Sequence, residues 1–269
     1  MRGRPLWGAA LVGVAALTLA SCTSDTDPAP SASSSAIPSV TAPEVSTSPD
    51  SGIASVAVTS EIATAPSGSL DLYDGPGGTL ADTIDGADVL SAPDQTPLVF
   101  LVKKHVDDWL EVYLPIMPNG STGWVPAAAV DIATTDFRIE VSLDDYTLTL
   151  FDGADAVVTT EVGVGREDRP TPGGVYYVRE LLQPPNPDGP YGPYAYGLSG
   201  YQPVLDSFKG GDPIIGIHGT NEPESLGSDV SSGCLRVDND VITEMVVDYG
   251  VPLGTPVYIA DGSAAGTAA

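Results

Sequence analysis

The sequence predicts a mostly β protein with one clear helix, in which two small folded domains follow a long polar segment. Three observations favour this fold class. Short apolar runs that alternate with polar residues recur between turn-forming residues from residue 56 to about residue 178. A helical repeat appears after residue 238. Finally, 42% of the 269 residues are hydrophobic, which suits two cores of ordinary domain size.

Residues 1–21 have the pattern of a secretory signal. Arg2 and Arg4 precede an apolar stretch, and a Leu-Ala-Ser run leads directly to Cys22, as in a lipoprotein cleavage box. We therefore expect Cys22 to carry a lipid that holds an exported protein on a membrane. An ordinary signal peptide with a chance cysteine is the alternative. Lipidation of Cys22 would leave Cys234 without a disulfide partner, which favours a reactive role for this thiol.

Residues 22–55 consist mainly of serine, threonine, alanine and proline, with almost no large apolar side chains. Such a segment cannot bury enough surface to offset the loss of chain entropy, so we expect a disordered tether. A glycosylated stalk has the same composition and stays open as an alternative. Residues 263–269 are expected to form a disordered tail.

Residues 56–134 are expected to form a small all-β barrel. The run of residues 109–114 alternates, and a Pro-Asn-Gly-Ser-Thr turn follows at residues 118–122, which predicts a hairpin. With its Gly-Trp-Val ending, this hairpin resembles the last hairpin of bacterial SH3-like wall-binding modules, which implies peptide binding. A plain β spacer with Trp109 and Trp124 in its core is the alternative.

Residues 135–262 are expected to form the second domain. Phe137, Ile139 and Val141 alternate before a turn, and another alternating run follows, which predicts a hairpin. Further strands are expected at residues 157–164, 175–178, 214–217 and 255–259.

The segment 183–201 holds five prolines and four tyrosines. This composition predicts a long loop that lies over or beside a site. The clearest helix comes later, where Asp238 can cap a repeat of apolar residues that includes Ile242 and Met245, and where Gly250 can end it. We assign those apolar residues to the core.

One histidine and one cysteine stand sixteen positions apart, each next to a glycine. His218 follows an apolar run that predicts a buried strand, and Cys234 follows small residues that leave room for a substrate carbonyl. A neighbouring imidazole can take the proton of a thiol and hold the thiolate as an ion pair. The two residues are therefore a candidate base and nucleophile, and the amides of Gly233 and Cys234 are candidate donors to an oxyanion. An unrelated core cysteine and surface histidine form the alternative.

Two short runs around this pair carry a family resemblance. Residues 218–221 read His-Gly-Thr-Asn, and residues 231–236 read Ser-Ser-Gly-Cys-Leu-Arg. Together they resemble the active-site signature of the L,D-transpeptidase (YkuD-type) catalytic domain. The Thr-Pro-Gly-Gly run at residues 171–174 is similar to a turn of the same family. Ser232 departs from the pattern, since many members carry histidine there.

The resemblance implies a β-sandwich-like catalytic domain and two-step acyl transfer on peptidoglycan stem peptides. Cys234 would attack the carbonyl on the L-centre of the third residue of a tetrapeptide stem, and the terminal D-alanine would leave. His218, oriented by the backbone carbonyl of Gly219, would move the proton. An amine of a second stem would then resolve the thioester and form a 3→3 cross-link. A carbapenem would inhibit by acylating Cys234, and the exported lipoprotein would face the cell wall.

The same resemblance implies further substrate-binding residues. We expect Ser231, Ser232, Thr220 and Tyr201 to contact the stem peptide, and Arg236 to hold either the loop or a stem carboxylate. Two other functions stay open. One is L,D-carboxypeptidase or D-amino-acid exchange activity on the same stems, and the other is a catalytically idle wall-binding scaffold.

Composition excludes some classes of partner. The formal net charge of −26 argues against binding to nucleic acid. The sequence has no Cys/His cluster for zinc, and its acidic residues lack the spacing of a metal-binding loop. We therefore expect neither a metal nor another cofactor.

Overall fold

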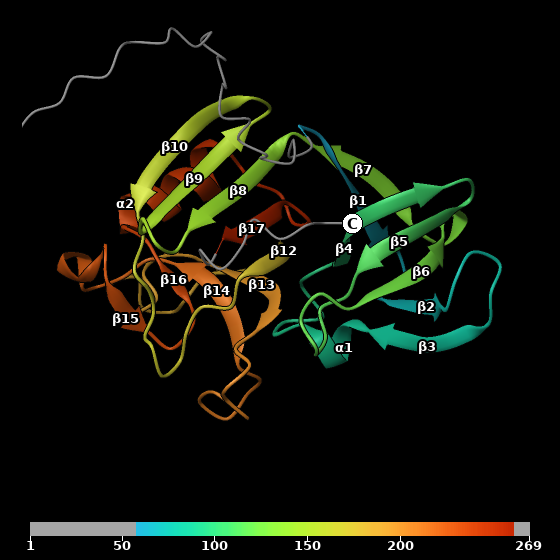
Figure 1. The fold of residues 1–269 in the computed structure, drawn as a ribbon, viewed down its shortest axis with the longest axis horizontal. Coiled ribbons are helices and arrows are strands. Elements are labelled where there is room, and N and C mark those ends of the chain that lie inside the picture. Colours follow the sequence, from blue (N-terminus) through green and yellow to red (C-terminus); the bar gives the residue numbers. More distant parts are fainter. Residues whose placement is uncertain (1–57, 261–269) are drawn as a thin grey trace, which may run out of the picture. The chain divides into compact units, whose positions relative to one another are not determined.

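The computed structural model describes residues 58–260 (Figure 1). The predicted signal, Cys22, the tether and the C-terminal tail lie outside the described residues. Strands dominate residues 58–260, which confirms the mostly β prediction. No helix in this range has the length and hydrophobicity needed to cross a membrane.

The first seven strands form a sheet, the N-terminal sheet, in the order β3-β2-β6-β5-β4-β1-β7. Its strands are β1 (Ser60–Ala65), β2 (Ser69–Tyr73), β3 (Leu80–Asp85), β4 (Leu98–Val106), β5 (Trp109–Tyr113), β6 (Thr122–Pro126) and β7 (Asp131–Thr135). A short helix, α1 (Gly86–Val89), follows β3, and a 3-10 turn, η1 (Ala127–Ala129), follows β6.

The hairpin predicted in this part of the chain is present as β5 and β6. Leu110 pairs with Val125, and both side chains are fully buried. Trp109, one residue earlier, points to the opposite face, where its ring lies edge-on to Tyr73 at a centroid distance of 5.2 Å. Trp124 likewise precedes a buried residue and is only half-buried. The alternative reading, with both tryptophans in the core, is therefore wrong in this respect, because strand alternation sends both indoles to the face away from the core.

The second domain forms an eight-stranded sheet in the order β10-β9-β8-β17-β12-β13-β14-β16. Its strands are β8 (Phe137–Ser142), β9 (Thr147–Asp152), β10 (Asp155–Glu161), β12 (Gly174–Leu182), β13 (Ala195–Tyr201), β14 (Ile214–His218), β16 (Leu235–Arg236) and β17 (Pro256–Ala260). A separate parallel pair joins β11 (Val164–Gly165) to β15 (Asp229–Ser231), and a 3-10 turn, η2 (Pro223–Ser225), precedes β15.

The hairpin predicted at the start of this domain is the β8–β9 pair. Ile139 lies opposite Leu150 and Val141 lies opposite Leu148, and all four side chains are buried in the core. The last strand, β17, pairs in parallel with β8 on one side and antiparallel with β12 on the other. The last strand, β17, therefore lies between the β8–β9 hairpin and strands β12, β13 and β14.

Two expected elements have different bounds. The strand expected at residues 157–164 runs as β10 and stops at Glu161. The segment 183–201 is a loop only as far as residue 194, and the remainder is β13. Tyr196 and Leu198 of β13 are fully buried between neighbouring strands. The alternation of β13 is hard to see in the sequence because small residues separate its large ones. One of the small residues, Gly197, is required by the close approach of β12, since a Cβ at Gly197 would lie 2.6 Å from Glu180 Cγ.

The predicted helix begins at its predicted cap. Asp238 accepts an amide hydrogen bond of 2.8 Å at the start of α2 (Asn239–Thr243). The helix then continues as a π-helical turn, η3 (Glu244–Asp248), and Gly250 follows it with a φ of +60°. Ile242 and Met245 are fully buried, which confirms that they belong to the core.

Buried contacts join β4 of the first sheet to β12 of the second. Tyr177 of β12 lies in an apolar cluster with Ile62, Val99 and Leu101 of the N-terminal sheet. Next to it, the Glu180 carboxylate accepts hydrogen bonds from the amide and the hydroxyl of Ser91, at 2.8 and 3.0 Å. The two large sheets of residues 58–260 therefore share a buried contact.

Candidate active site

Strands β14 and β16 bring His218 and Cys234 together. The two strands run parallel, with Ile217 opposite Leu235 and His218 opposite Arg236. His218 is the last residue of the buried strand β14, as predicted, and Cys234 directly precedes β16. The end of β14 and the residue before β16, sixteen positions apart in the chain, are therefore brought near each other.

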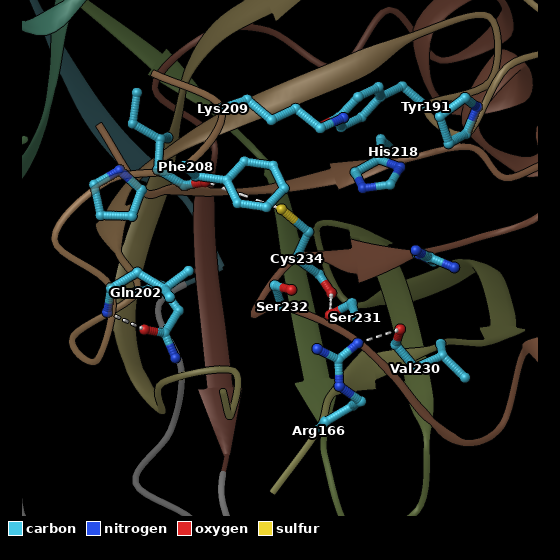
Figure 2. Close-up of a pocket in the computed structure, with 15 residues that line it drawn as sticks. Arg166, Tyr191, Gln202, Phe208, Lys209, His218, Val230, Ser231, Ser232 and Cys234 are labelled. Carbon is cyan, nitrogen blue, oxygen red and sulfur yellow. Dashed lines mark hydrogen bonds between the residues drawn. The ribbon is translucent and has the colours of Figure 1, made fainter. Parts of the chain in front are cut away.

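Both side chains line a cavity of about 240 Å³. Figure 2 shows the sulfur of Cys234 between the imidazole of His218 and the ring of Phe208. Tyr191 belongs to the connection between β12 and β13, and Phe208 to the connection between β13 and β14. Two loops that leave opposite ends of β13 thus form walls of the cavity around the thiol.

His218 is held in one tautomer. Its Nδ1 lies 2.6 Å from the carbonyl oxygen of Gly219, and a carbonyl oxygen can only accept, so Nδ1 carries the proton and Nε2 has the free lone pair. Burial lowers the pKa of His218 to about 4, against the opposing effect of this hydrogen bond. The imidazole is therefore a neutral base at neutral pH.

The Cys234 thiol is also neutral at rest. Burial raises the pKa of this thiol above its ordinary value, although the backbone of Gly216 and the charges of Arg236 and Lys209 act in the opposite direction. The expected thiolate–imidazolium ion pair is thus not the resting state, because the surroundings of both groups disfavour charge. The site instead holds a protonated thiol, which donates to the Ile214 carbonyl at 3.9 Å, and a neutral imidazole in the same cavity.

The backbone before Cys234 is held by Ser231 and Gln202. Gly233 has a φ of +116°, and a Cβ at this position would lie 2.6 Å from Gln202 Cγ. The Gly233 amide donates to Ser231 Oγ at 3.0 Å, and that hydroxyl donates to the Cys234 carbonyl at 2.6 Å. Within residues 58–260, the Cys234 amide donates no hydrogen bond. Of the two predicted oxyanion donors, Cys234 N–H is thus available and Gly233 N–H is occupied.

Comparisons with known proteins decide the family. A family model described as the L,D-transpeptidase catalytic domain, YkuD, matches residues 136–259. A relative from Bacillus licheniformis, named "Putative L,D-transpeptidase YkuD", is 37% identical over 126 residues, which are 47% of this chain and 67% of the relative. The chain belongs to the L,D-transpeptidase (YkuD) family.

Other members of the L,D-transpeptidase family match the same region. The protein of the same name from Bacillus subtilis is 36% identical over 129 residues, which cover 48% of this chain and 69% of that one. Among solved structures, the catalytic domain of an Enterococcus faecium L,D-transpeptidase is 24% identical. That match covers 46% of this chain and 96% of the other, with a TM-score of 0.33.

Three of the predicted substrate-binding residues of this L,D-transpeptidase domain line the cavity, namely Ser231, Ser232 and Arg236. Arg236 donates to Glu222 at 3.0 Å, which holds the loop between β14 and β16. Thr220 is buried outside the lining: its amide donates to Asn239 Oδ1 at 2.9 Å. The Thr220 hydroxyl accepts from the Glu222 amide at 3.1 Å, so this side chain braces the turn after β14 and does not line the cavity.

Tyr201 lies elsewhere, which corrects its expected contact with substrate. The residue is 7% exposed and does not line the cavity. Its hydroxyl donates to the Pro115 carbonyl at 2.7 Å and accepts from Arg179 Nη1 at 3.1 Å. Its amide donates to Asn119 Oδ1 at 2.9 Å. Because β13 carries Tyr201 toward the β5–β6 connection, this residue joins the two large sheets.

Sequence reasoning missed several residues of the transpeptidase cavity. Tyr191 packs against His218 with ring centroids 4.8 Å apart, and Lys209 donates to the Tyr191 hydroxyl at 3.2 Å. Arg166 and Phe208 also line the cavity. The proline- and tyrosine-rich composition of residues 183–201 is the sequence signal that could have indicated Tyr191. No local signal marks the other three, because each stands alone in a segment without a motif.

Proposed function

We propose that this protein is an exported L,D-transpeptidase that forms 3→3 cross-links in peptidoglycan through a thioester on Cys234, and that a lipid on Cys22 anchors it to the membrane. One observation supports the catalytic part most directly. The cavity that contains the Cys234 thiol also contains a neutral His218, whose free Nε2 is left as a base by the bond between Nδ1 and the Gly219 carbonyl.

Acylation begins from the neutral pair. The Cys234 sulfur attacks the carbonyl carbon on the L-centre of the third stem residue while His218 Nε2 accepts the thiol proton. The bond from this carbon to the nitrogen of D-alanine then breaks, and His218 returns the proton to the leaving amine. Charge exists on the two side chains only during this step, which suits surroundings that keep both neutral at rest.

The negative charge that develops on the carbonyl oxygen needs hydrogen-bond donors. The Cys234 amide is the first donor, because within residues 58–260 it makes no other hydrogen bond. The Gly233 amide becomes the second when it leaves Ser231 Oγ. Ser231 can keep its bond to the Cys234 carbonyl during this exchange, so the loop stays braced.

Deacylation uses an amine of a second stem. This amine attacks the thioester, His218 accepts its proton, and the proton returns to sulfur as the new amide forms. Ser231, Ser232 and Arg236 are the proposed contacts to the stem peptides, since all three line the cavity. Water in place of the amine would make the protein an L,D-carboxypeptidase, and a free D-amino acid would make it an exchange enzyme.

The proposal is tested by offering tetrapeptide and pentapeptide muropeptides separately and following the products by mass spectrometry. We expect loss of D-alanine and a cross-linked dimer from the tetrapeptide alone. His218→Ala should slow this by roughly a hundredfold or more, the usual scale for losing a general base. Tripeptide without dimer would indicate the carboxypeptidase. Turnover of the pentapeptide with an inert tetrapeptide would overturn the L,D assignment.

A carbapenem provides an independent test of the nucleophile. Its β-lactam carbonyl stands in for the donor carbonyl, so we expect one covalent adduct per chain by intact mass. Cys234→Ala should abolish this adduct. An adduct that persists in the variant would point to another nucleophile, and the absence of both adduct and turnover in the parent protein would favour the idle scaffold.

A further inference from the structure

The cavity beside Cys234 is positively charged within an acidic protein. The chain has a formal net charge of −26 and only ten lysines and arginines, yet Arg166, Lys209 and Arg236 all line this cavity. Arg166 and Arg236 have acidic partners, at 3.4 Å from Asp168 and 3.0 Å from Glu222. Lys209 has no carboxylate partner among the residues that the structure describes. An anionic group of a ligand would therefore meet the Lys209 charge unopposed.

Aromatic side chains hold the Lys209 ammonium in place. Its Nζ donates to the Tyr191 hydroxyl at 3.2 Å and lies 4.7 Å from the centre of that ring and 5.4 Å from the centre of the Phe208 ring. The Tyr191 ring in turn contacts His218. In Figure 2, Lys209 and Tyr191 lie on one side of Cys234 together with His218, whereas Arg166 lies on the other side.

The proposed reaction requires a carboxylate at this place. His218 gives its proton to the leaving amine, so the nitrogen of the leaving amino acid must lie next to His218. Its α-carboxylate is only two bonds away along the backbone, so the carboxylate oxygens lie within about 4 Å of that nitrogen. This position is on the His218 side of the thiol, where Tyr191 holds Lys209.

We propose that Lys209, positioned by Tyr191, binds the free α-carboxylate of the amino acid that leaves when the thioester forms, and also that of an amino acid that replaces it. The inference rests on the function proposed above. A pentapeptide has a neutral peptide bond where a tetrapeptide has this carboxylate, so Lys209 contributes to the selection of donor length. An entering amine takes the place of the leaving one, so the same contact selects acceptors that carry an α-carboxylate.

The test is an exchange reaction on a tetrapeptide donor with D-methionine or D-methioninamide as the acceptor. For each enzyme variant, kcat/KM is measured with both acceptors by mass spectrometry, and the acid-to-amide ratio is compared among variants, which cancels the different basicity of the two amines. Loss of a charge-assisted hydrogen bond should lower this ratio about tenfold or more in Lys209→Met. Lys209→Arg should retain most of it. Lys104→Met is the matched control, since Lys104 is exposed on β4 and outside the cavity, and it should keep the parent ratio.

An unchanged acid-to-amide ratio in Lys209→Met would overturn the inference while leaving the transpeptidase proposal intact. Absence of turnover in the parent protein with every acceptor would instead overturn the proposed function. A carbapenem adduct on each variant shows that its site is folded. If Lys209→Met forms no adduct, Tyr191→Phe is tested in its place. Removal of the hydroxyl that holds Lys209 Nζ should lower the acid-to-amide ratio several-fold. An unchanged ratio in Tyr191→Phe would overturn the inference.

Discussion

Burial determines the charge state of the two reactive side chains. His218 is 5% exposed, and its surroundings hold its pKa near 4, well below that of an ordinary histidine. The Cys234 thiol is shifted in the opposite sense, toward a higher pKa. Both shifts favour the neutral form, and in the proposed mechanism the proton moves only when a substrate carbonyl accepts the electrons of the sulfur. The pH dependence of the reaction should therefore differ from that of a preformed ion pair.

We expect the acid limb of carbapenem acylation at Cys234 to lie near pH 4. Above this pH the imidazole of His218 is neutral and accepts the thiol proton, and below it the imidazole is protonated and cannot, so the rate falls as the pH decreases through about 4. Acylation rates by intact mass between about pH 3 and pH 8 provide the measurement. Circular dichroism is the control for folding, and a midpoint near 6.5 would contradict the buried neutral base.

The same shift has a consequence for stability. The unfolded chain binds a proton at His218 near pH 6.5 and the folded chain only near pH 4, so the unfolded state binds more protons between these values. The contribution of His218 to the free energy of unfolding is therefore complete above about 6.5 and is lost as the pH falls toward 4. Acidification thus weakens the fold and the base together.

At the scale of elements, the turn after β14 is packed against the start of α2. A Cβ at Gly219 would overlap Asn239 Oδ1 and would lie 3.0 Å from Gly192 Cα. The same Asn239 oxygen accepts the Thr220 amide at 2.9 Å. The carbonyl that orients His218 therefore belongs to a turn fixed by the first residue of a helix and by a neighbouring loop. This is why the residue after His218 must be small.

We expect Gly219→Ala to lower the free energy of unfolding by about 1–3 kcal/mol, the usual cost of overpacking. It should also slow acylation of Cys234, because a displaced Gly219 carbonyl no longer holds the His218 tautomer. Denaturant unfolding and carbapenem acylation rates provide the two measurements. Gly75→Ala is the matched control, since a Cβ at Gly75 meets nothing within 4 Å. Equal behaviour of the two variants would show that the turn tolerates displacement.

At the scale of the whole molecule, the contact between the sheets is built from buried polar groups. Arg179 and Glu180 are each 1% exposed and form an ion pair at 3.2 Å. Tyr201 adds hydrogen bonds to Arg179 and to the Pro115 carbonyl, and Ser91 adds two to Glu180. Removing one member leaves a buried partner unsatisfied, which costs more than a surface hydrogen bond would.

Tyr201→Phe separates a structural role from a binding role. We expect a loss of about 1–3 kcal/mol in the free energy of unfolding, because Arg179 and the Pro115 carbonyl each lose a buried partner. The KM for tetrapeptide should change by less than about twofold, because Tyr201 does not reach the cavity. Tyr73→Phe is the control, since in residues 58–260 the Tyr73 hydroxyl makes no hydrogen bond. A large rise in KM with unchanged stability would restore the substrate contact.

The anchor prediction also concerns the whole molecule. Replacement of Cys22 by alanine should release the protein into the soluble fraction or leave its signal uncleaved, because the small residues before Cys22 form a lipoprotein cleavage box. Fractionation of cells followed by intact mass checks this. If Cys22→Ala stays on the membrane as firmly as the parent protein, the lipid assignment is wrong.

The sequence by itself determined those features that depend on neighbouring residues. The alternation at Ile139 and Val141, the cap at Asp238 and the two runs that contain His218 and Cys234 are local patterns, and each one predicted its element or its family correctly. The pairing of β14 with β16 then brought together His218 and Cys234, which the two runs had already identified as candidates.

The tertiary structure alone decided the rest, because burial and neighbours across the fold are not local properties. Tyr201 contacts the N-terminal sheet's β5–β6 connection, Trp109 points away from the core of its sheet, and β13 continues a segment that reads as a loop. Lys209 reaches the cavity through a fold that places its loop beside Tyr191. The neutral state of His218 and Cys234 also follows from burial, since the spacing of the same two residues in the chain suits an ion pair equally well.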